Sequence, residues 1–401
     1  MKKYFVLAAL FTLSLITYID RACISVASTP ISTELSLSNQ AMGAVFSAFA
    51  LGYAIAQMPG GWLADKFGPR LALSLVVIIW SFFTGLTGAV SSFSAMLAVR
   101  FLFGASEAGA FPGSARAIYN WLPATQRGIA NGILFSGSRI GAAISFPLLT
   151  WMLTKYQWRN SFVILAVVGT VWALLWYIFF RDQPQEKSAS DIVQNEPQAF
   201  AKIFGSRKML LTMWQYFASN FTFFICLSWM LPYLKSQYSL SNEAAAGYAT
   251  IPLLFGASAQ WIAGFAVDSL YRSGLKKWSR QLPAMVGFAL AVGGLFALPF
   301  AHSPAVAVGC FALATFGVDL TLSPSWSFCL DIGGANSGSI SGAMNMVGNI
   351  GSFVSANAFP FLIAQTGSAS TYFFVAAILN LSAIFCWIYL RSPISPGAQT
   401  T

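Results

Sequence analysis

Residues 61–70 read GWLADKFGPR and separate two long apolar runs, residues 40–63 and 70–91. Gly68 suits a tight turn, because glycine reaches backbone conformations that are closed to other residues. Asp65 stands at the end of the first run, where a carboxylate can hold basic side chains or the amides of a helix terminus. The pattern predicts two long helices joined by a short basic turn.

The chain contains too little charge to build a surface that faces water. Of its 401 residues, 57% are hydrophobic and 8% are charged, whereas a soluble domain carries about 25% charged residues. A helix that crosses a bilayer needs about 20 apolar residues, and twelve such stretches can be marked. We therefore expect an all-α polytopic protein embedded in a lipid bilayer. The expected spans are residues 4–27, 40–63, 70–91, 94–117, 127–153, 160–180, 209–234, 243–268, 281–301, 304–329, 337–364 and 370–390.

The net charge of +10 is distributed in a way that argues against a nucleic-acid partner. The basic residues of the expected loops gather on one side of the membrane, and only Lys155, Arg159 and Lys235 fall on the other side. Cytoplasmic loops carry such an excess of Lys and Arg. We therefore expect both chain termini and the 181–208 loop to be cytoplasmic.

Short loops and the lack of a targeting peptide favour a multi-pass protein of a bacterial inner membrane. The protein is expected to be a monomer. The first apolar run follows Lys2 and Lys3, as in a signal peptide, but Asp20 and Arg21 stand where small residues would precede cleavage. It is expected to be retained as the first helix. The five cysteines lie in or at the ends of apolar spans, which predicts ordinary packing with no disulfide and no metal site.

An internal repeat divides the chain into two halves. The sequence SLSN occurs at residues 36–39 and again at 239–242, an offset of 203. The same offset aligns Gln57 with Gln260, Gly61 with Gly264 and Asp65 with Asp268. A parallel repeat places a substrate site between two halves that rock against each other. The expected boundaries are a six-helix bundle at 1–181, a cytoplasmic linker at 182–208 and a second bundle at 209–401.

Six ionisable residues fall within the expected spans: Asp20, Arg21, Arg100, Glu107, Arg139 and Asp319. A charge at the centre of a membrane helix costs roughly 2.5–3.5 kcal/mol on insertion scales, so each must be paired, hydrated or functional. One interpretation is a set of structural ion pairs, Asp20 with Arg100 and Arg139 with Asp319. The other is a binding and coupling site.

Charge chemistry favours the second interpretation. Arg100 and Glu107 are two helical turns apart and share one face of a helix. Arginine binds carboxylates bidentately and remains protonated, while a buried carboxylate can load and release a proton. Together they predict symport of an organic anion with protons. The single histidine, His302, is expected in a solvated outer loop rather than in a proton relay.

The 61–70 stretch resembles the loop signature between helices 2 and 3 of the major facilitator superfamily. The resemblance implies a gating role for Gly61, Asp65, Gly68, Arg70 and the repeat-related Asp268. The sequence YIDR at 18–21, Arg100, and GASEAGAFP at 104–112 look like the anion:cation symporter family. That family includes bacterial acid-sugar importers and the sialin and vesicular glutamate group. Further similarity lies at 121–128, 158–159 and 331–345.

The resemblance implies roles for individual residues. Arg21 and Arg100 would bind or gate the substrate carboxylate, and Asp20 and Glu107 would carry protons. Tyr18, Tyr53, Trp326 and Asn345 match positions that line the sugar site, although ordinary packing of the aromatics is the alternative.

The sequence also departs from the acid-sugar pattern. Ser138 and Arg139 stand where such importers often present a glutamine, and a later helix carries Asp319. Either Arg139 pairs with Asp319 across the two halves, or it binds a second carboxylate of the substrate. Asp319 is a further candidate for a proton-coupling residue. The latter predicts a substrate with more than one acidic group.

Three other classes of function are less well supported by the residues. An exporter of metabolites or drugs has the same fold, but residues 141–147, GAAISFP, lack the glycine-proline run common in proton antiporters. A transporter-like sensor would have a degraded 61–70 motif or an added domain. No nucleophile elbow, metal-ligand spacing or phosphate loop suggests an enzyme, and no cofactor is expected beyond protons as the coupling ion.

Overall fold

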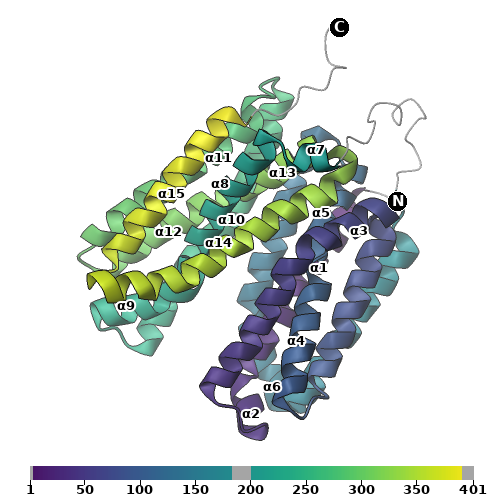
Figure 1. The fold of residues 1–401 in the computed structure, drawn as a ribbon, viewed down its shortest axis with the longest axis vertical. Helices are drawn as coiled ribbons and strands as arrows, with labels where there is room; N and C mark the ends of the chain where they lie inside the picture. Colours follow the sequence, from purple (N-terminus) through teal and green to yellow (C-terminus); the bar gives the residue numbers. More distant parts are fainter. Residues whose placement is uncertain (1–2, 183–199, 391–401) are drawn as a thin grey trace. The chain divides into compact units, whose positions relative to one another are not determined.

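The computed structural model describes residues 3–182 and 200–390, and within these residues all regular secondary structure is helical (Figure 1). The chain forms two compact units. Unit 1 comprises Met1–Leu122, Gly137–Gln198 and Gly333–Ala343, and unit 2 comprises Pro123–Ser136, Ala199–Ile332 and Met344–Thr401. The predicted linker falls largely outside the described residues, so its boundaries stay a prediction.

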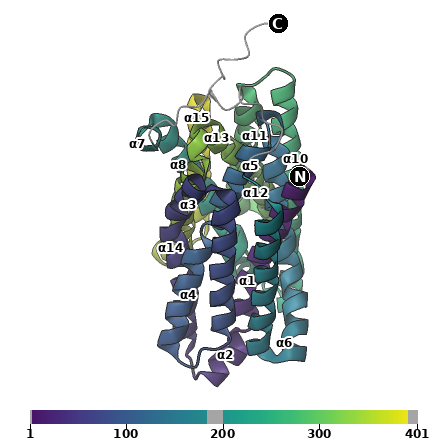
Figure 2. The same ribbon diagram turned by 90° about the vertical axis from the view of Figure 1, so that its right-hand side faces the viewer.

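Unit 1 is a bundle of long helices from the first half of the chain. In both views of the fold α1, α3, α4 and α6 run side by side (Figures 1 and 2). The indole of Trp172 on α6 donates to the carbonyl of Ala9 on α1 at 3.1 Å. The helices are α1 (Lys3–Val26), α2 (Ser28–Glu34), α3 (Asn39–Thr87), α4 (Phe93–Glu107), α5 (Ala110–Trp121) and, shared with unit 2 at its start, α6 (Arg127–Phe179).

Unit 2 contains the later helices. Short 3-10 turns at Ala124–Gln126, Leu298–Phe300 and Gly334–Asn336 connect helices, the last of them in unit 1. The remaining helices are α7 (Phe200–Phe204), α8 (Arg207–Phe224), α9 (Met230–Tyr238), α10 (Asn242–Arg272), α11 (Trp278–Ala297), α12 (Pro304–Leu320), α13 (Leu322–Gly333), α14 (Ser337–Thr366) and α15 (Ser370–Tyr389). A π-helical turn, Ile225–Trp229, joins α8 to α9.

Helices lie at each of the predicted apolar spans, with ends that differ by a few residues. By length and composition, seven helical stretches of the described chain are able to cross a membrane. Several of these stretches are long because a helix continues through the turn between two predicted spans. The number of crossings therefore stays a prediction.

The turn predicted at Gly68 is present inside α3. Gly68 has φ 80° and ψ 151°, and a Cβ there would lie 2.7 Å from the carboxylate of Asp182. That carboxylate accepts a 2.8 Å hydrogen bond from the backbone amide of Arg70. A side chain at position 68 is therefore disfavoured by both backbone conformation and space.

Two predicted spans are broken in the middle. The chain leaves α4 after Glu107 and enters α5 at Ala110, and it leaves α12 after Leu320 and enters α13 at Leu322. A proline follows each break, Pro112 and Pro324. Because proline has no amide hydrogen and crowds the carbonyl four residues earlier, it interrupts the helix there.

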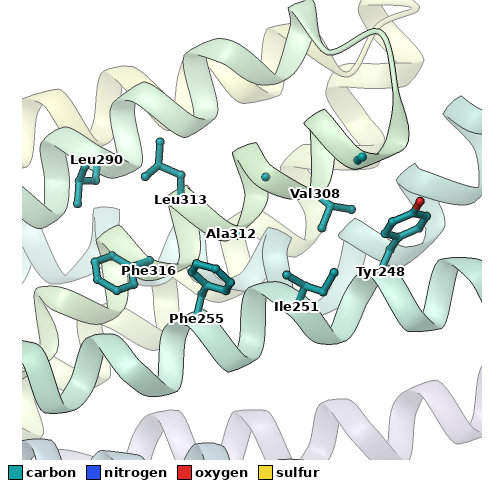
Figure 3. A pocket seen from close by; sticks show the side chains of 10 residues that line it. Tyr248, Ile251, Phe255, Leu290, Val308, Ala312, Leu313 and Phe316 are labelled. Carbon is teal, nitrogen blue, oxygen red and sulfur yellow. The ribbon is translucent and has the colours of Figure 1, made fainter.

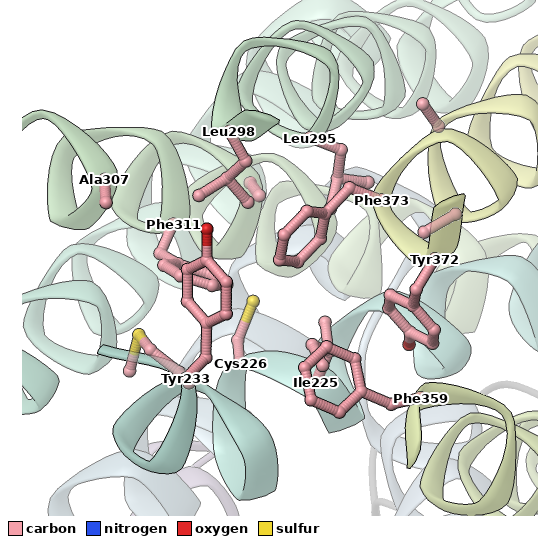
Figure 4. Close-up of a cluster of buried hydrophobic side chains, with 14 of the residues drawn as sticks. Ile225, Cys226, Tyr233, Leu295, Leu298, Ala307, Phe311, Phe359, Tyr372 and Phe373 are labelled. Atoms are coloured by element: carbon pink, nitrogen blue, oxygen red, sulfur yellow. The ribbon is translucent and has the colours of Figure 1, made fainter. Parts of the chain in front are cut away.

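Each unit has its own apolar core. In unit 1, one cluster joins α1, α2, α3 and α6 through Cys23, Ile31, Met42 and Trp158. In unit 2 an aromatic cluster gathers Tyr233, Phe311, Phe359, Tyr372 and Phe373 (Figure 4). The rings of Phe359 and Tyr372 meet edge to face at 5.2 Å. These apolar clusters hold in place the helices that carry the buried polar residues.

Candidate functional site

Four charged residues of unit 1 are brought together within the bundle. They are Asp20, Arg21, Arg100 and Glu107, and we call them the charged cluster. Arg21 on α1 donates from Nε to Oε1 of Glu107 on α4 at 2.9 Å. The Glu107 side chain is fully buried, whereas 20% of the Arg21 side chain is exposed. The pair therefore keeps its carboxylate inside, while a part of the Arg21 side chain remains accessible.

Aromatic rings surround both arginines. The guanidinium carbon of Arg21 lies 4.3 Å from the ring centre of Tyr53 and 5.2 Å from that of Tyr18. Arg100 lies 4.5 Å from the ring of Phe103. Phe49 contacts both guanidinium groups, at 5.4 Å from Arg21 and 5.1 Å from Arg100. Such rings attract a cation through their faces and exclude water from it.

Asp20 is held by a tryptophan rather than by the predicted arginine. Its Oδ2 accepts a 3.1 Å hydrogen bond from the indole of Trp80 on α3. Asp20 and Arg100 are both buried, with 1% and 2% exposure, and no ion pair within 4.0 Å joins them in the described part of the chain. The structural pairing considered for these two residues is therefore wrong in this conformation.

The charged cluster contains more hydrogen-bonding capacity than it uses. Four of its buried atoms have no hydrogen-bond partner: Oδ1 of Asp20, Nη2 of Arg21, Nε of Arg100 and Oε2 of Glu107. A buried polar atom without a partner costs about 1–3 kcal/mol, and more when it is charged. The two guanidinium nitrogens are thus able to bind a ligand carboxylate, and the two carboxylate oxygens are able to take up protons.

The two aspartates of the predicted gating motif both cap helix N-termini. Asp65 accepts from the backbone amides of Gly338 at 2.8 Å and Ser339 at 2.6 Å, within unit 1. Asp268 accepts from those of Gly128 at 2.8 Å and Ile129 at 2.7 Å, within unit 2. These amides begin α14 and α6, where free N–H groups favour an anion. Their role in gating stays a prediction.

Close backbone packing accompanies the Asp65 cap. A Cβ on Gly61 would overlap the carbonyl of Gly338, so the first residue of the motif admits no side chain. Arg116 lies 3.9 Å from Asp65 and donates to the carbonyl of Gly334 at 3.0 Å. The motif is therefore built into unit 1 through α3, α5 and the start of α14.

The predicted site residues of the second half lie in unit 2. Trp326 is fully buried and donates from its indole to the hydroxyl of Tyr216 at 2.9 Å. Its ring also packs against Phe135 at 5.1 Å. Asn345 is 7% exposed. Asp319 is buried against α10, where a Cβ on Gly256 would overlap its carboxylate.

Ser138 and Arg139 lie on α6 in unit 1. The glycines that flank them approach α1 closely, because a Cβ on Gly137 would lie 2.5 Å from the carbonyl of Phe11 and one on Gly141 would lie 2.7 Å from that of Leu15. Ser138 is buried and Arg139 is partly exposed. Whether Arg139 pairs with Asp319 or binds an anion stays a prediction.

Sequence reasoning found Tyr18 and Tyr53 but missed three other aromatic residues that contact the charged cluster. Phe49, Trp80 and Phe103 each contact a charged side chain, but a ring within an apolar helix looks like ordinary packing. For Phe49 a weak signal exists, since it precedes Tyr53 by one helical turn and so lies on the same face.

The larger of two described cavities does not suit an anion. It measures about 470 Å³ and lies among α10, α11 and α12 of unit 2. Apart from the hydroxyl of Tyr248, its lining side chains are apolar, among them Phe255, Leu290 and Phe316 (Figure 3). Unlike this cavity, the charged cluster offers guanidinium donors that can bind a carboxylate.

Comparison with known proteins gives one consistent result. A model of the Major Facilitator Superfamily matches residues 10–356. The chain is 33% identical to a probable sulfoacetate transporter, SauU, of Cupriavidus necator, with 95% of this chain and 92% of that protein covered. It is 31% identical to a hexuronate transporter of Bacillus subtilis, with coverage of 97% and 94%. Among solved structures, the proton:xylose symporter XylE with bound 6-bromo-6-deoxy-D-glucose superposes with a TM-score of 0.78 at 16% identity, covering 96% of this chain and 95% of that one.

Proposed function

Because the chain belongs to the major facilitator superfamily, a family of transporters rather than enzymes, we propose that it takes up a small organic anion together with protons. In this proposal twelve helices cross the inner membrane of a bacterium, with both termini in the cytoplasm. The protein works as a monomer by alternating access, and protons are its coupling ion.

The observation that carries the proposal is the Arg21–Glu107 pair with its unused atoms. Glu107 occupies one edge of the guanidinium through a 2.9 Å bond, while Nη2 of Arg21 has no partner. A carboxylate ligand of the same geometry competes with Glu107 for Arg21. When Glu107 takes up a proton, its hold on Arg21 weakens and the substrate carboxylate replaces it. Anion binding and proton binding are thereby linked at one guanidinium.

Asp20 and Arg100 extend this arrangement. Arg100 supplies a second buried cation for the anion, and Phe49 lies against both arginines, which keeps the two cations near one another. Asp20, held by Trp80, is the second group able to carry a proton. Tyr18 and Tyr53 add hydroxyl-bearing rings beside Arg21 that suit a hydroxylated substrate. Trp326 and Asn345 of the second half are further predicted substrate-binding residues.

The named substrates of the two relatives suggest a substrate class. A hexuronate carries one carboxylate and several hydroxyls, whereas sulfoacetate carries two acidic groups and no hydroxyl. Both are small organic acids, and an arginine-centred site suits either. We therefore expect an acid sugar or another small carboxylate with one or two acidic groups.

Transport by the purified protein tests the proposal. The protein is reconstituted in liposomes that contain a pH-sensitive dye, an electrical gradient is imposed, and glucuronate, sulfoacetate and related acids are added. Acidification of the lumen by one acid, lost in Glu107→Gln, supports proton-coupled anion symport. Arg100→Ala should lose uptake as well.

Glu34→Gln is the matched control, because it makes the same change at a carboxylate bound to Trp158 and Arg159 outside the charged cluster. It should retain proton movement. Proton movement with apolar drugs or cations, and with none of the acids, would contradict symport of an anion and favour an exporter of the same fold.

A further inference from the structure

A second cavity, in unit 1, lies between α2 and the first turns of α3. It measures about 310 Å³ and is lined by Ser28, Thr29, Ser32, Thr33, Met42 and Phe46. Four of these six residues carry hydroxyls, and all four come from the short helix α2. We call it the α2 cavity. Its lining has no ionisable side chain.

The α2 cavity lies on the same helix faces as the charged cluster. Backbone bonds from Ala27 to Cys23 and from Ile31 to Ala27 carry the helical path from α1 into α2. Ser28 and Ser32 follow Arg21 by 7 and 11 residues, which returns them to the face of Arg21. On α3, Phe46 precedes Tyr53 by seven residues on one face. Seven residues of helix rise about 10 Å, so the cavity lies roughly that far from Arg21 along both helices.

The hydroxyls of the α2 cavity divide into two kinds. Ser28 donates to the carbonyl of Ser25 at the end of α1 at 2.7 Å, and Thr33 donates to that of Thr29 within α2 at 3.0 Å, so both can only accept from a ligand. The hydroxyls of Thr29 and Ser32 form no hydrogen bond with the described residues. They are able to donate as well as accept. A hydroxylated ligand fits this combination, because its own hydroxyls both donate and accept hydrogen bonds.

The opposite wall of the α2 cavity is apolar. Met42 is buried and Phe46 is 37% exposed, so a thioether side chain and a ring face the hydroxyls. A polyol or sugar presents C–H surfaces between its hydroxyls, which pack against such a wall. A small acid without hydroxyls has neither feature to offer here.

The lining of the α2 cavity contains no cation that would bind an anion, and no uncompensated carboxylate that would repel one. The nearest ionisable residue along the chain is Glu34, at the end of α2. Its carboxylate is bound by Trp158 at 2.6 Å and by two nitrogens of Arg159 at 3.0 and 2.8 Å. Its charge is thus compensated, so repulsion of an approaching acid is reduced.

From the hydroxyl wall, the facing apolar wall and the shared helix faces, we infer that the α2 cavity is a subsite for the polyhydroxylated part of the substrate. The solute contacts it before its carboxylate reaches Arg21. The inference rests on the proposed transport function, and it adds a determinant that distinguishes hydroxylated acids from those that have none.

The test compares two acids in reconstituted protein. The double variant Thr29→Val with Ser32→Ala removes the two unengaged hydroxyls with little change of volume. We expect the KM for glucuronate to rise about 3- to 10-fold, as for loss of one or two neutral hydrogen bonds. The KM for sulfoacetate should be unchanged. Thr250→Val is the matched control, since it removes an exposed helix hydroxyl in unit 2, and Thr29→Ser should behave as wild type.

An unchanged KM for glucuronate, or equal shifts for both acids, would overturn the inference. A second measurement separates it from the proposed function. Saturation-transfer NMR with galactitol, a neutral polyol, detects the subsite in the purified full-length chain without transport. The signal should persist in Arg21→Ala and fall in the double variant. If wild type transports no acid, the proposed function fails, and absence of the galactitol signal would then separately overturn the subsite.

Discussion

The two repeat-related halves share their aspartate helix caps but differ in the charged residues of their interiors. Asp65 and Asp268 are related by the repeat, and each accepts two backbone amides at the start of a helix. The interior does not follow this symmetry. At the same offset of 203, Asp20 and Arg21 of the charged cluster correspond to Phe223 and Phe224. Both halves thus have an aspartate that caps a helix N-terminus, whereas Asp20 and Arg21 have no charged counterparts in the second half.

Tyr53 and the residue at the repeat-related position illustrate this difference. Tyr53 covers the guanidinium of Arg21 in unit 1. Its counterpart in unit 2 is Gly256, and the space left by the missing side chain is taken by the carboxylate of Asp319. The comparison teaches that the Arg21–Glu107 ion pair of unit 1 has no counterpart at the repeat-related positions of unit 2. The ion pairs of unit 2 lie elsewhere, between Asp331 and both Arg127 and Arg280.

The largest effect is expected at Arg21, where the two halves differ most. Arg21→Ala removes the partner of a fully buried carboxylate, and loss of one member of a buried charge pair costs about 2–5 kcal/mol, roughly 30-fold or more in affinity. Uptake of radiolabelled substrate should fall accordingly. Arg21→Lys should recover only part of it, since lysine keeps the charge without the planar fork. Full activity in Arg21→Lys would show that charge alone suffices.

The aspartate caps should give smaller and matching effects. Asp65→Asn and Asp268→Asn each leave one oxygen for two amides, and a hydrogen bond to a charged group is worth about 1.5–3 kcal/mol. We expect both variants to slow uptake by about tenfold or more while leaving KM within about twofold. Initial rates across substrate concentrations measure this. A large effect in one variant and none in the other would break the symmetry between the halves.

A substitution of Arg139 tests how many acidic groups the substrate carries. If Arg139 binds a second anionic group, Arg139→Gln should raise the KM for sulfoacetate roughly 3- to 10-fold and leave glucuronate nearly unchanged. Competition between the two acids in wild type and variant provides the measurement. Equal uptake of monoanions and dianions, unaltered by the substitution, would assign Arg139 to a structural role.

The smallest effect is expected at Glu34, far along α1 and α2 from the charged cluster. Hydrogen bonds from Arg159, and then from Trp158, lower the pKa of Glu34 below its usual value. A lowered pKa stabilises the fold above the pKa of the unfolded chain, about 4.3, and this contribution disappears as pH falls through the folded value. Glu34→Gln should therefore melt slightly below wild type at pH 7, and the gap should narrow as the pH is lowered below about 4.3. A gap that widens on acidification would contradict this pairing.

The positions of the helices were predictable because apolar length and turn residues act locally. Gly68 was expected to turn and does so. The breaks before Pro112 and Pro324 were not predicted, although the prolines were visible, since neighbouring helices often re-satisfy a proline-freed carbonyl within a membrane span. The π-helical turn at 225–229 has no signal in the sequence that we recognise.

The charged members of the site were predictable because an ionisable residue in an apolar span demands an explanation. Their pairing was not. Glu107 bonds to Arg21 rather than simply sharing a face with Arg100, and Asp20 bonds to Trp80. The choice between partners depends on how α1, α3 and α4 rotate against each other, which the sequence pattern of one helix does not specify. Neither does it show which rings, such as Phe49, face the charges.

The Asp268 cap has a consequence for how such contacts can be detected in families of sequences. Both of its donors are main-chain amides, those of Gly128 and Ile129. Any residue except proline supplies the same amide at position 129, so a change there requires no compensating change at position 268. Correlated substitution between aligned positions is blind to a bond of this kind. The bond to the amide of residue 129 can thus persist over long divergence while leaving a trace only at position 268. Position 128 differs, because a Cβ there would lie 2.7 Å from Oδ1 of Asp268.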